Sequence, residues 1–249
     1  MSKRLIVFLG LFLMTATIAQ AKTTGEIPEV SGVYDDPGHP GIKVRVFVHQ
    51  GKPQPVPSPV CSLADPDSNA VVEPLAWQLP SGWTYNLNTN SAPSGLGAVL
   101  PIVAGRAFTA WQTGINNQVA FSRGSDTTAN RQAHDLKNII AWGRTNGSAL
   151  AVTYTRYNSA TGQVVDVDTI MNQKFAWSWT DQATNALCSW TNTYDAQNIL
   201  THELGHWLGL NDEYTDAFAD NTMFGYGSQA EVKKDTLTTG DIQGALAIY

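Results

Sequence analysis

The sequence predicts an α+β fold, because strand-like and helix-like segments occupy separate stretches of the chain. Between residues 83 and 171, short apolar or alternating runs are bounded by turn residues, as in β-strands. A helical repeat of apolar residues at 100–114 interrupts these runs. Two more helical stretches follow, one ending near residue 209 and one at 237–249.

The individual strands are defined by their apolar runs and turns. Residues 83–87 predict a first strand, and residues 119–121 and 138–142 predict short buried strands. Residues 149–157 and 164–171 predict a hairpin, because the turn-like sequence NSATG joins them. After a connecting stretch, Asp195 is expected to cap the next helix.

The first 21 residues indicate that the protein is exported. Residues 1–21 contain Lys3 and Arg4, an apolar run and a small-residue ending, which is typical of a secretory signal peptide. The mature protein is therefore expected to be secreted or extracellular, with the periplasm as the alternative. No other long apolar segment follows, so no membrane association is expected after removal of the signal peptide.

Residues 22–60 form a separate segment, either an N-terminal arm that stays packed on the mature protein or a pro-region removed on activation. Residues 43–50 alternate, with Val44, Val46 and Val48 on one face, as in an edge strand. The four prolines that follow predict an extended linker. The segment carries no clear inhibitory motif, which slightly favours the arm. Residues 61–249 are predicted to form the main domain.

Charge and composition exclude some partners. Charged residues make up 14% of the chain and the formal net charge is −6, which argues against a surface for nucleic acid or anionic membranes. The separate histidines His39, His49 and His134 are expected at the surface rather than in a metal site.

The stretch THELGHWLGLNDE at 201–213 predicts a metal site. On a helix, His202 and His206 lie one turn apart on one face, so both imidazoles can bind one ion. Glu203 is rotated about 100° from His202, which leaves it free to act as a base on a metal-bound water.

A catalytic zinc ion usually takes three protein ligands and keeps one position open. Gly209 can end the helix with a positive φ, and the chain that turns there can bring Asp212 to the same ion. Asp212 is therefore the predicted third ligand.

The resulting pattern, H-E-x-x-H-x-x-G-x-x-D, resembles the zinc-binding motif of the metzincin proteases, and the segments around it are similar to the matrixin branch. The usual third ligand there is histidine, and Asp212 resembles the snapalysin type. The sequence NTMFGYG at 221–227 resembles the Met-turn, which would place Met223 beneath the zinc. The stretch 237–249 is similar to the terminal matrixin helix. The resemblance spans about residues 77–249.

This resemblance implies a secreted zinc endopeptidase, a monomer acting on protein or peptide substrates. Its fold would be a twisted mixed β-sheet with two helices above the zinc cleft, and a small irregular lower subdomain ending in a helix. Glu203 would be the general base. Residues 149–157 would form an edge strand, along which an extended substrate could pair. Tyr214 and Tyr226 are weaker candidates for an assisting tyrosine.

The resemblance implies one catalytic zinc ion. The His- and Asp-rich loop that holds a structural zinc in matrixins is absent, so the resemblance implies no second zinc ion here. Ca²⁺ could bind Asp166 and Asp168, which alternate on one strand face, but plain solvation of these carboxylates is favoured.

Cys61 and Cys188 are expected to form a disulfide, because an even pair in an exported protein usually does. The residues around Cys61 match the matrixin cysteine switch poorly, since its flanking arginine and glycine are missing.

Two alternatives remain open. Glu231 could serve as the third zinc ligand of a different peptidase type, although the spacing of Gly209 and Asp212 argues against it. The chain could also be a non-catalytic secreted peptide-binding module or adhesin on the same fold. The presence of Glu203 disfavours this, because zinc binding alone needs no base.

Overall fold

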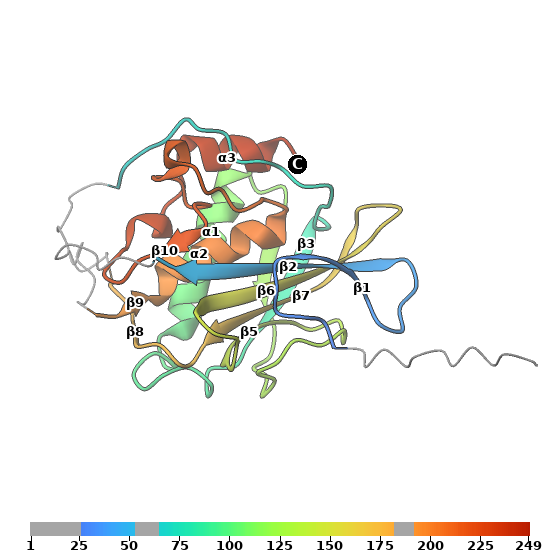
Figure 1. The fold of residues 1–249 in the computed structure, drawn as a ribbon, viewed down its shortest axis with the longest axis horizontal. Coiled ribbons are helices and arrows are strands. Elements are labelled where there is room, and N and C mark those ends of the chain that lie inside the picture. The colour runs from blue at the N-terminus through green and yellow to red at the C-terminus, as the bar shows by residue number, and fades with distance from the viewer. Residues whose placement is uncertain (1–25, 53–64, 182–191) are drawn as a thin grey trace, which may run out of the picture.

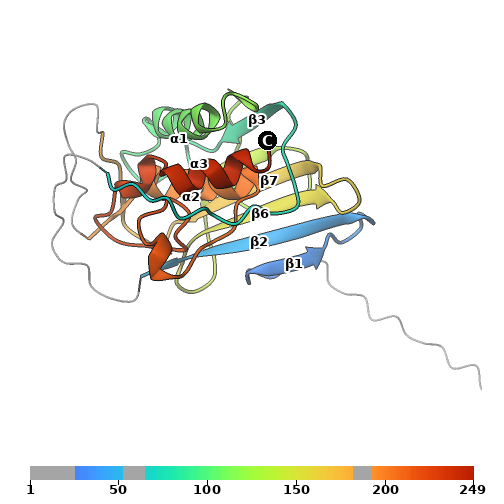
Figure 2. The ribbon, with the colours of Figure 1, turned by 90° about the horizontal axis from the view of Figure 1, so that it is seen from above.

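The computed structural model describes residues 26–52, 65–181 and 192–249, and in these ranges the chain forms a mixed β-sheet with three α-helices. The predicted α+β class is therefore confirmed. The helices lie over one face of the sheet (Figures 1 and 2). The strands of the main sheet are β1 (Gly32–Asp35), β2 (Ile42–Gly51), β3 (Gly82–Leu87), β4 (Ala120–Arg123), β5 (Asn138–Gly143), β6 (Ala149–Asn158), β7 (Val164–Asn172) and the short β10 (Tyr226–Gly227). A separate small pair consists of β8 (Trp177–Ser178) and β9 (Tyr194–Asp195).

The sheet has the order β1-β2-β6-β7-β5-β3-β4, and β10 also pairs with β2. Strands β3, β4, β5 and β7 pair in parallel, whereas β6 is antiparallel to both of its neighbours. The predicted hairpin is confirmed as β6 and β7. Its turn is held by the side chain of Asn158, which accepts hydrogen bonds from the backbone amides of Ala160 and Thr161.

The prediction that residues 149–157 form a sheet edge is wrong. Strand β2 pairs with β6 along its whole length, from Ile42 opposite Asn158 to Gln50 opposite Ala149. The prediction that residues 43–50 form an edge strand is also wrong, because β2 has β6 on one side and β1 and β10 on the other. Pairing between segments about a hundred positions apart depends on long-range packing, which alternation within one segment does not reveal.

Strand β2 has buried side chains on both of its faces. Val44, Val46 and Val48 pack into a core on the face that the helices leave open. Phe47 and His49 point to the opposite face and are fully buried there.

Two helices form the layer next to the sheet. Helix α1 (Leu100–Gly114) buries Val103, Ala107 and Trp111 along one side. Helix α2 (Ala196–Leu208) starts at the predicted cap, where the Asp195 side chain accepts from two backbone amides of the first turn. The two helices are joined where the Trp111 indole donates to the backbone carbonyl of Thr201.

The chain after α2 is mostly irregular, with the short 3₁₀ helices η2 (Asp216–Phe218) and η3 (Lys233–Asp235), and it ends in α3 (Thr239–Leu246). Helix α3 begins with the reciprocal hydrogen bonds of a capping box between Thr238 and Asp241. Among the described residues, no helix is long and apolar enough to cross a membrane.

Candidate metal centre

Helix α2 presents two fully buried imidazoles to one point. The Nδ1 of His202 lies 2.8 Å from the carbonyl oxygen of Thr222, and the Nδ1 of His206 lies 2.9 Å from that of Leu210. A carbonyl oxygen only accepts, so each Nδ1 must carry the hydrogen. In the neutral imidazoles the lone pair is therefore on Nε2, on the side away from these carbonyls. Burial lowers the pKa of His202 to about 4, which keeps it neutral, whereas the Asp212 carboxylate outweighs burial and raises the pKa of His206.

The chain turns back under the two histidines as predicted. Gly209 ends α2 with a φ of 101°, a left-handed conformation that favours glycine. Its lack of a side chain also matters, because a Cβ there would come within 2.8 Å of the Trp77 carbonyl oxygen. This turn places the Oδ1 of Asp212 3.1 Å from the Nε2 of His202 and 3.4 Å from the Nε2 of His206.

These three atoms fit a metal ion. All three are buried without a hydrogen-bond partner, although two imidazole lone pairs and a carboxylate repel one another unless a positive charge lies between them. Ligands about 2.0 to 2.1 Å from a tetrahedral zinc are separated from one another by about 3.3 Å, which agrees with the observed spacing. Two nitrogens and one oxygen also form a donor set that suits Zn²⁺. The three residues can therefore hold a metal ion.

Glu203 lies beside this centre with both carboxylate oxygens engaged. Its Oε1 is 3.0 Å from the Nδ1 of His49, and its Oε2 accepts a hydrogen bond of 2.6 Å from the Thr153 hydroxyl. Burial raises the pKa of Glu203 to about 7. Its carboxyl group can therefore exchange a proton near neutral pH.

His49 corrects an expectation from sequence, since it was predicted at the surface and is fully buried against the centre. It is 154 positions from Glu203, and strand pairing alone brings the two together. One signal could have indicated this position. His49 alternates with the valines of β2 and shares a face with Phe47, although Lys43 and Arg45 on that face give it a mixed character in the sequence.

Strand β2 covers the centre. The ring of Phe47 stacks on that of His206 with centroids 3.7 Å apart and an interplanar angle of 6°. The ring of His49 lies 3.9 Å from that of His202. His202, Glu203 and His206 are 0% exposed, so in this conformation the centre is closed to solvent.

Met223 packs directly against α2. A Cβ added at Gly205 would overlap the Met223 side chain, so only glycine leaves room for this contact. The turn around Met223 is anchored by the Asp241 carboxylate, which accepts from the backbone amides of Thr222 and Met223. Because Thr222 supplies the carbonyl that orients His202, α3 indirectly positions a candidate ligand.

Lys234 is a further buried residue near the centre that sequence reasoning missed. Its amino group donates to the backbone carbonyls of Phe224 and Tyr226. Burial lowers its pKa to about 8. Lys234 lies in the short helix η3 between polar neighbours, so its burial gives no local signal in the sequence.

The alternative residues lie differently. The Glu231 carboxylate accepts a 3.4 Å hydrogen bond from Asn198, one turn before His202, and Glu231 is in none of the candidate metal groups found among the described residues. The pKa of Tyr214 is raised, first by burial and second by the nearby negative charge of the Asp212 carboxylate. The Tyr226 ring packs edge-on against that of Tyr214.

The expectation of plain solvation for Asp166 and Asp168 is wrong. Both are buried, and both accept hydrogen bonds from the guanidinium of Arg156, at 2.7 and 3.2 Å. The arginine occupies the position that the sequence analysis considered for calcium.

Residues 1–21, Cys61 and Cys188 lie outside the described residues, so the signal peptide and the disulfide stay predictions. A scan against protein-family models found no match, and a search of curated proteins found no similar sequence.

Proposed function

We propose that this chain is a secreted zinc-dependent endopeptidase of the metzincin type, which hydrolyses protein or peptide substrates. The observation that carries the proposal is the convergence of three candidate ligand atoms, from His202, His206 and Asp212, beside the buried carboxylate of Glu203. Three protein ligands and one open position are typical of catalytic rather than structural zinc sites.

The roles of the residues follow from their contacts. His202, His206 and Asp212 would hold a zinc ion, which when bound polarises a carbonyl group and makes water more acidic. The carbonyls of Thr222 and Leu210 keep the two imidazoles oriented. Glu203 takes a proton from the attacking water and passes it to the leaving amine, a transfer suited to its pKa of about 7.

A substrate needs β2 to move away from the centre. This strand lies along β6, where an extended peptide would otherwise pair, and its His49 holds one oxygen of Glu203. We therefore take the covered conformation to be inactive. This favours a pro-region over a permanent arm for residues 22–60.

Hydrolysis of casein or gelatin, with and without 1,10-phenanthroline, tests the proposal. The full chain and a His49→Ala variant are assayed side by side, because the substitution removes the contact of β2 with Glu203. The His49→Ala variant is expected to hydrolyse the substrate. The chelator should abolish this hydrolysis, and added zinc should restore it. Zinc-loaded protein without activity in either form would contradict a peptidase.

A non-catalytic binding module is the second candidate, and the closed centre favours it. Both oxygens of Glu203 are engaged by the protein's own side chains, as in a site that serves structure alone. The same assay separates the two functions, since a binding module would hold zinc but hydrolyse nothing when β2 is loosened.

A further inference from the structure

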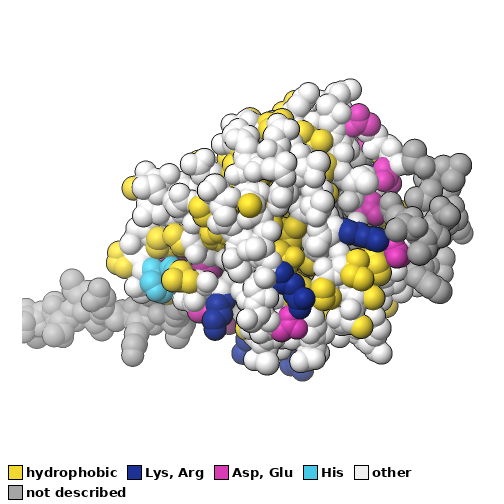
Figure 3. Space-filling model, turned by 180° about the vertical axis from the view of Figure 1, so that it is seen from behind, with side chains coloured by type: hydrophobic (Ala, Val, Ile, Leu, Met, Phe, Trp, Pro, Cys, Tyr) yellow, Lys and Arg dark blue, Asp and Glu magenta, His cyan; other side chains and the backbone are white. Residues whose placement is uncertain are grey.

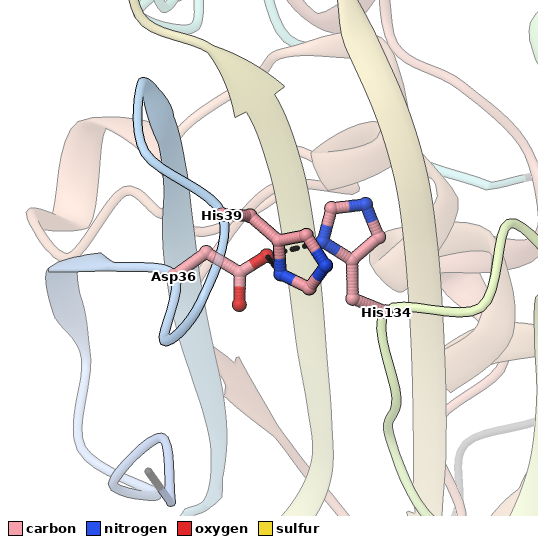
Figure 4. Close-up of side chains that lie close together, drawn as sticks. All are labelled: Asp36, His39 and His134. Carbon is pink, nitrogen blue, oxygen red and sulfur yellow. Dashed lines mark hydrogen bonds and ion pairs between the residues drawn. The ribbon is translucent and has the colours of Figure 1, made fainter.

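A second group of potential ligands lies where the N-terminal hairpin meets the rest of the domain. Asp36 and His39 belong to the turn between β1 and β2, whereas His134 lies in the segment that precedes β5. In Figure 4 the carboxylate of Asp36 faces both imidazoles. His39 and His134 are far apart in the sequence and were expected to be separate surface residues, and the fold brings them into contact.

The geometry places two imidazole nitrogens on one carboxylate oxygen. The Nδ1 of His39 lies 3.2 Å from the Oδ2 of Asp36, and the Nδ1 of His134 is bonded to the same oxygen. The two rings lie with centroids 3.9 Å apart. One ligand atom from each of the three residues therefore falls within 4.8 Å of the others.

The charges around Asp36 favour a cation. The Asp36 side chain is 5% exposed and has the Nε of Arg156 at 3.9 Å. The same guanidinium also pairs with the buried carboxylates of Asp166 and Asp168. The single positive charge of this arginine is thus shared among three carboxylates, and burial raises the pKa of both Asp166 and Asp168. A divalent ion beside Asp36 would supply positive charge where Arg156 lies 3.9 Å away and is bonded to the other two carboxylates.

We propose that Asp36, His39 and His134 form a second, peripheral zinc site. Two imidazoles and one carboxylate are zinc donors, and the 46% exposure of the His39 side chain leaves a side open to solvent. Histidine reaches the surface in the view from behind (Figure 3), and His39 and His134 are the described histidines with exposed side-chain atoms. This site shares no residue with the centre on α2.

The ion would fasten the hairpin to the domain. It would connect the turn between β1 and β2 with the segment before β5. The site lies on the sheet face opposite α2, because Arg156 beside it alternates in register with Tyr154 and Val152, which pack into the core on that face. Because β2 also covers the centre on α2, zinc at the peripheral site would hold the covered conformation in place.

Metal analysis of the full chain tests the site directly. Zinc is titrated into the metal-free wild type, His39→Ala, His134→Ala and Asp36→Asn, and the bound equivalents are counted by mass spectrometry of the native protein. Each variant is expected to lose one equivalent relative to the wild type. Asp35→Asn is the matched control, because Asp35 lies in the same hairpin, pairs with Lys43 and is exposed. It is expected to keep the full count.

A structural readout separates zinc binding from a folding defect. When zinc is added, hydrogen exchange in β1 and β2 is expected to slow at least 10-fold more in the wild type than in His39→Ala, which keeps the centre on α2. His39 is half exposed in a turn, so its substitution leaves the fold intact even if His134→Ala does not. An unchanged count in folded His39→Ala and His134→Ala would overturn the site, whatever the activity at Glu203.

Discussion

At the scale of single residues, the centre depends on which nitrogen of each histidine carries a hydrogen. The carbonyls of Thr222 and Leu210 take the Nδ1 hydrogens of His202 and His206, which turns both Nε2 lone pairs toward Asp212. A cation at this point satisfies all three groups, and removal of one group leaves the others buried and unpaired.

Asp212→Ala is expected to abolish stoichiometric zinc binding at this centre. The substitution removes the only carboxylate within 3.4 Å of both Nε2 atoms among the described residues. Glu231→Ala is the matched control, because its carboxylate contacts Asn198 rather than a histidine. Zinc analysis of both purified variants decides between the two ligands. Loss of zinc from Glu231→Ala alone would contradict the assignment of Asp212.

Glu203→Gln, made in the His49→Ala protein so that β2 no longer holds Glu203, is expected to keep zinc and fold but to lose at least about 100-fold in peptidase activity, since a base is removed and the ligands are not. Glutamine can still accept from Thr153 and occupies nearly the same volume. Steady-state hydrolysis of a casein-derived peptide, alongside zinc analysis, measures the effect. Activity within a few-fold of the parent would refute the role of Glu203.

At the scale of secondary-structure elements, α2 is confined on two sides. Met223 packs against Gly205 from one side, and β2 lies across the two histidines from the other. The ligands are therefore held by elements from both ends of the chain.

Gly205→Ala is expected to lower the free energy of unfolding by about 1 to 3 kcal/mol, because a Cβ would overlap the side chain of Met223 in a packed core. Gly105→Ala in α1 is the control. A Cβ there meets nothing within 4 Å, so this helical substitution should stabilise by about 0.5 to 1 kcal/mol. Urea unfolding measures both. Equal effects of the two substitutions would show that the Met223 contact is unimportant.

His49→Ala is expected to open the centre, because it removes the ring packed against His202 and the hydrogen bond to Glu203. The rate at which a chelator extracts zinc should rise at least about 10-fold, because loss of a residue that supports a metal ligand typically weakens metal binding by about 10-fold or more. Absorbance of a coloured chelator complex follows this rate. Lys43→Ala, near the start of the same strand and paired with the exposed Asp35, should leave it unchanged. Equal rates in all three proteins would mean that β2 does not control access.

At the scale of the whole molecule, the proposed metal site would couple zinc binding to folding. The ligands come from α2 and the turn after it, while their supports come from β2, β6 and the chain before α3. An unfolded chain does not hold these groups together, so zinc would bind the folded state preferentially.

Zinc at about 100 times its dissociation constant should stabilise the protein by about 2.7 kcal/mol, a rise in Tm of about 5 to 10 °C for a chain of this size. Differential scanning fluorimetry with zinc or with a chelator measures the shift. His202→Ala should show a smaller shift than the parent. An identical shift in this variant would contradict zinc binding on α2.

Local signals in the sequence were enough to predict helix α2 and the turn after it, which carry the candidate zinc ligands. The cap at Asp195, the stop at Gly209 and the spacing of His202 and His206 are decided within a few residues, by hydrogen bonds and backbone sterics. The return of Asp212 to the same point follows from that turn. The β6–β7 hairpin is similarly local, because the turn at Asn158 sets its register.

Only the tertiary structure decided what surrounds that motif. Strand β2 pairs with β6 rather than forming an edge, which buries His49 beside Glu203 and closes the centre. The same pairing brings Asp36 and His39 to His134. These contacts join segments about a hundred or more positions apart, and each depends on burial of apolar faces distributed along the whole chain. Periodicity within one segment identifies such a face, but the partner that covers it is selected by packing of the complete sheet.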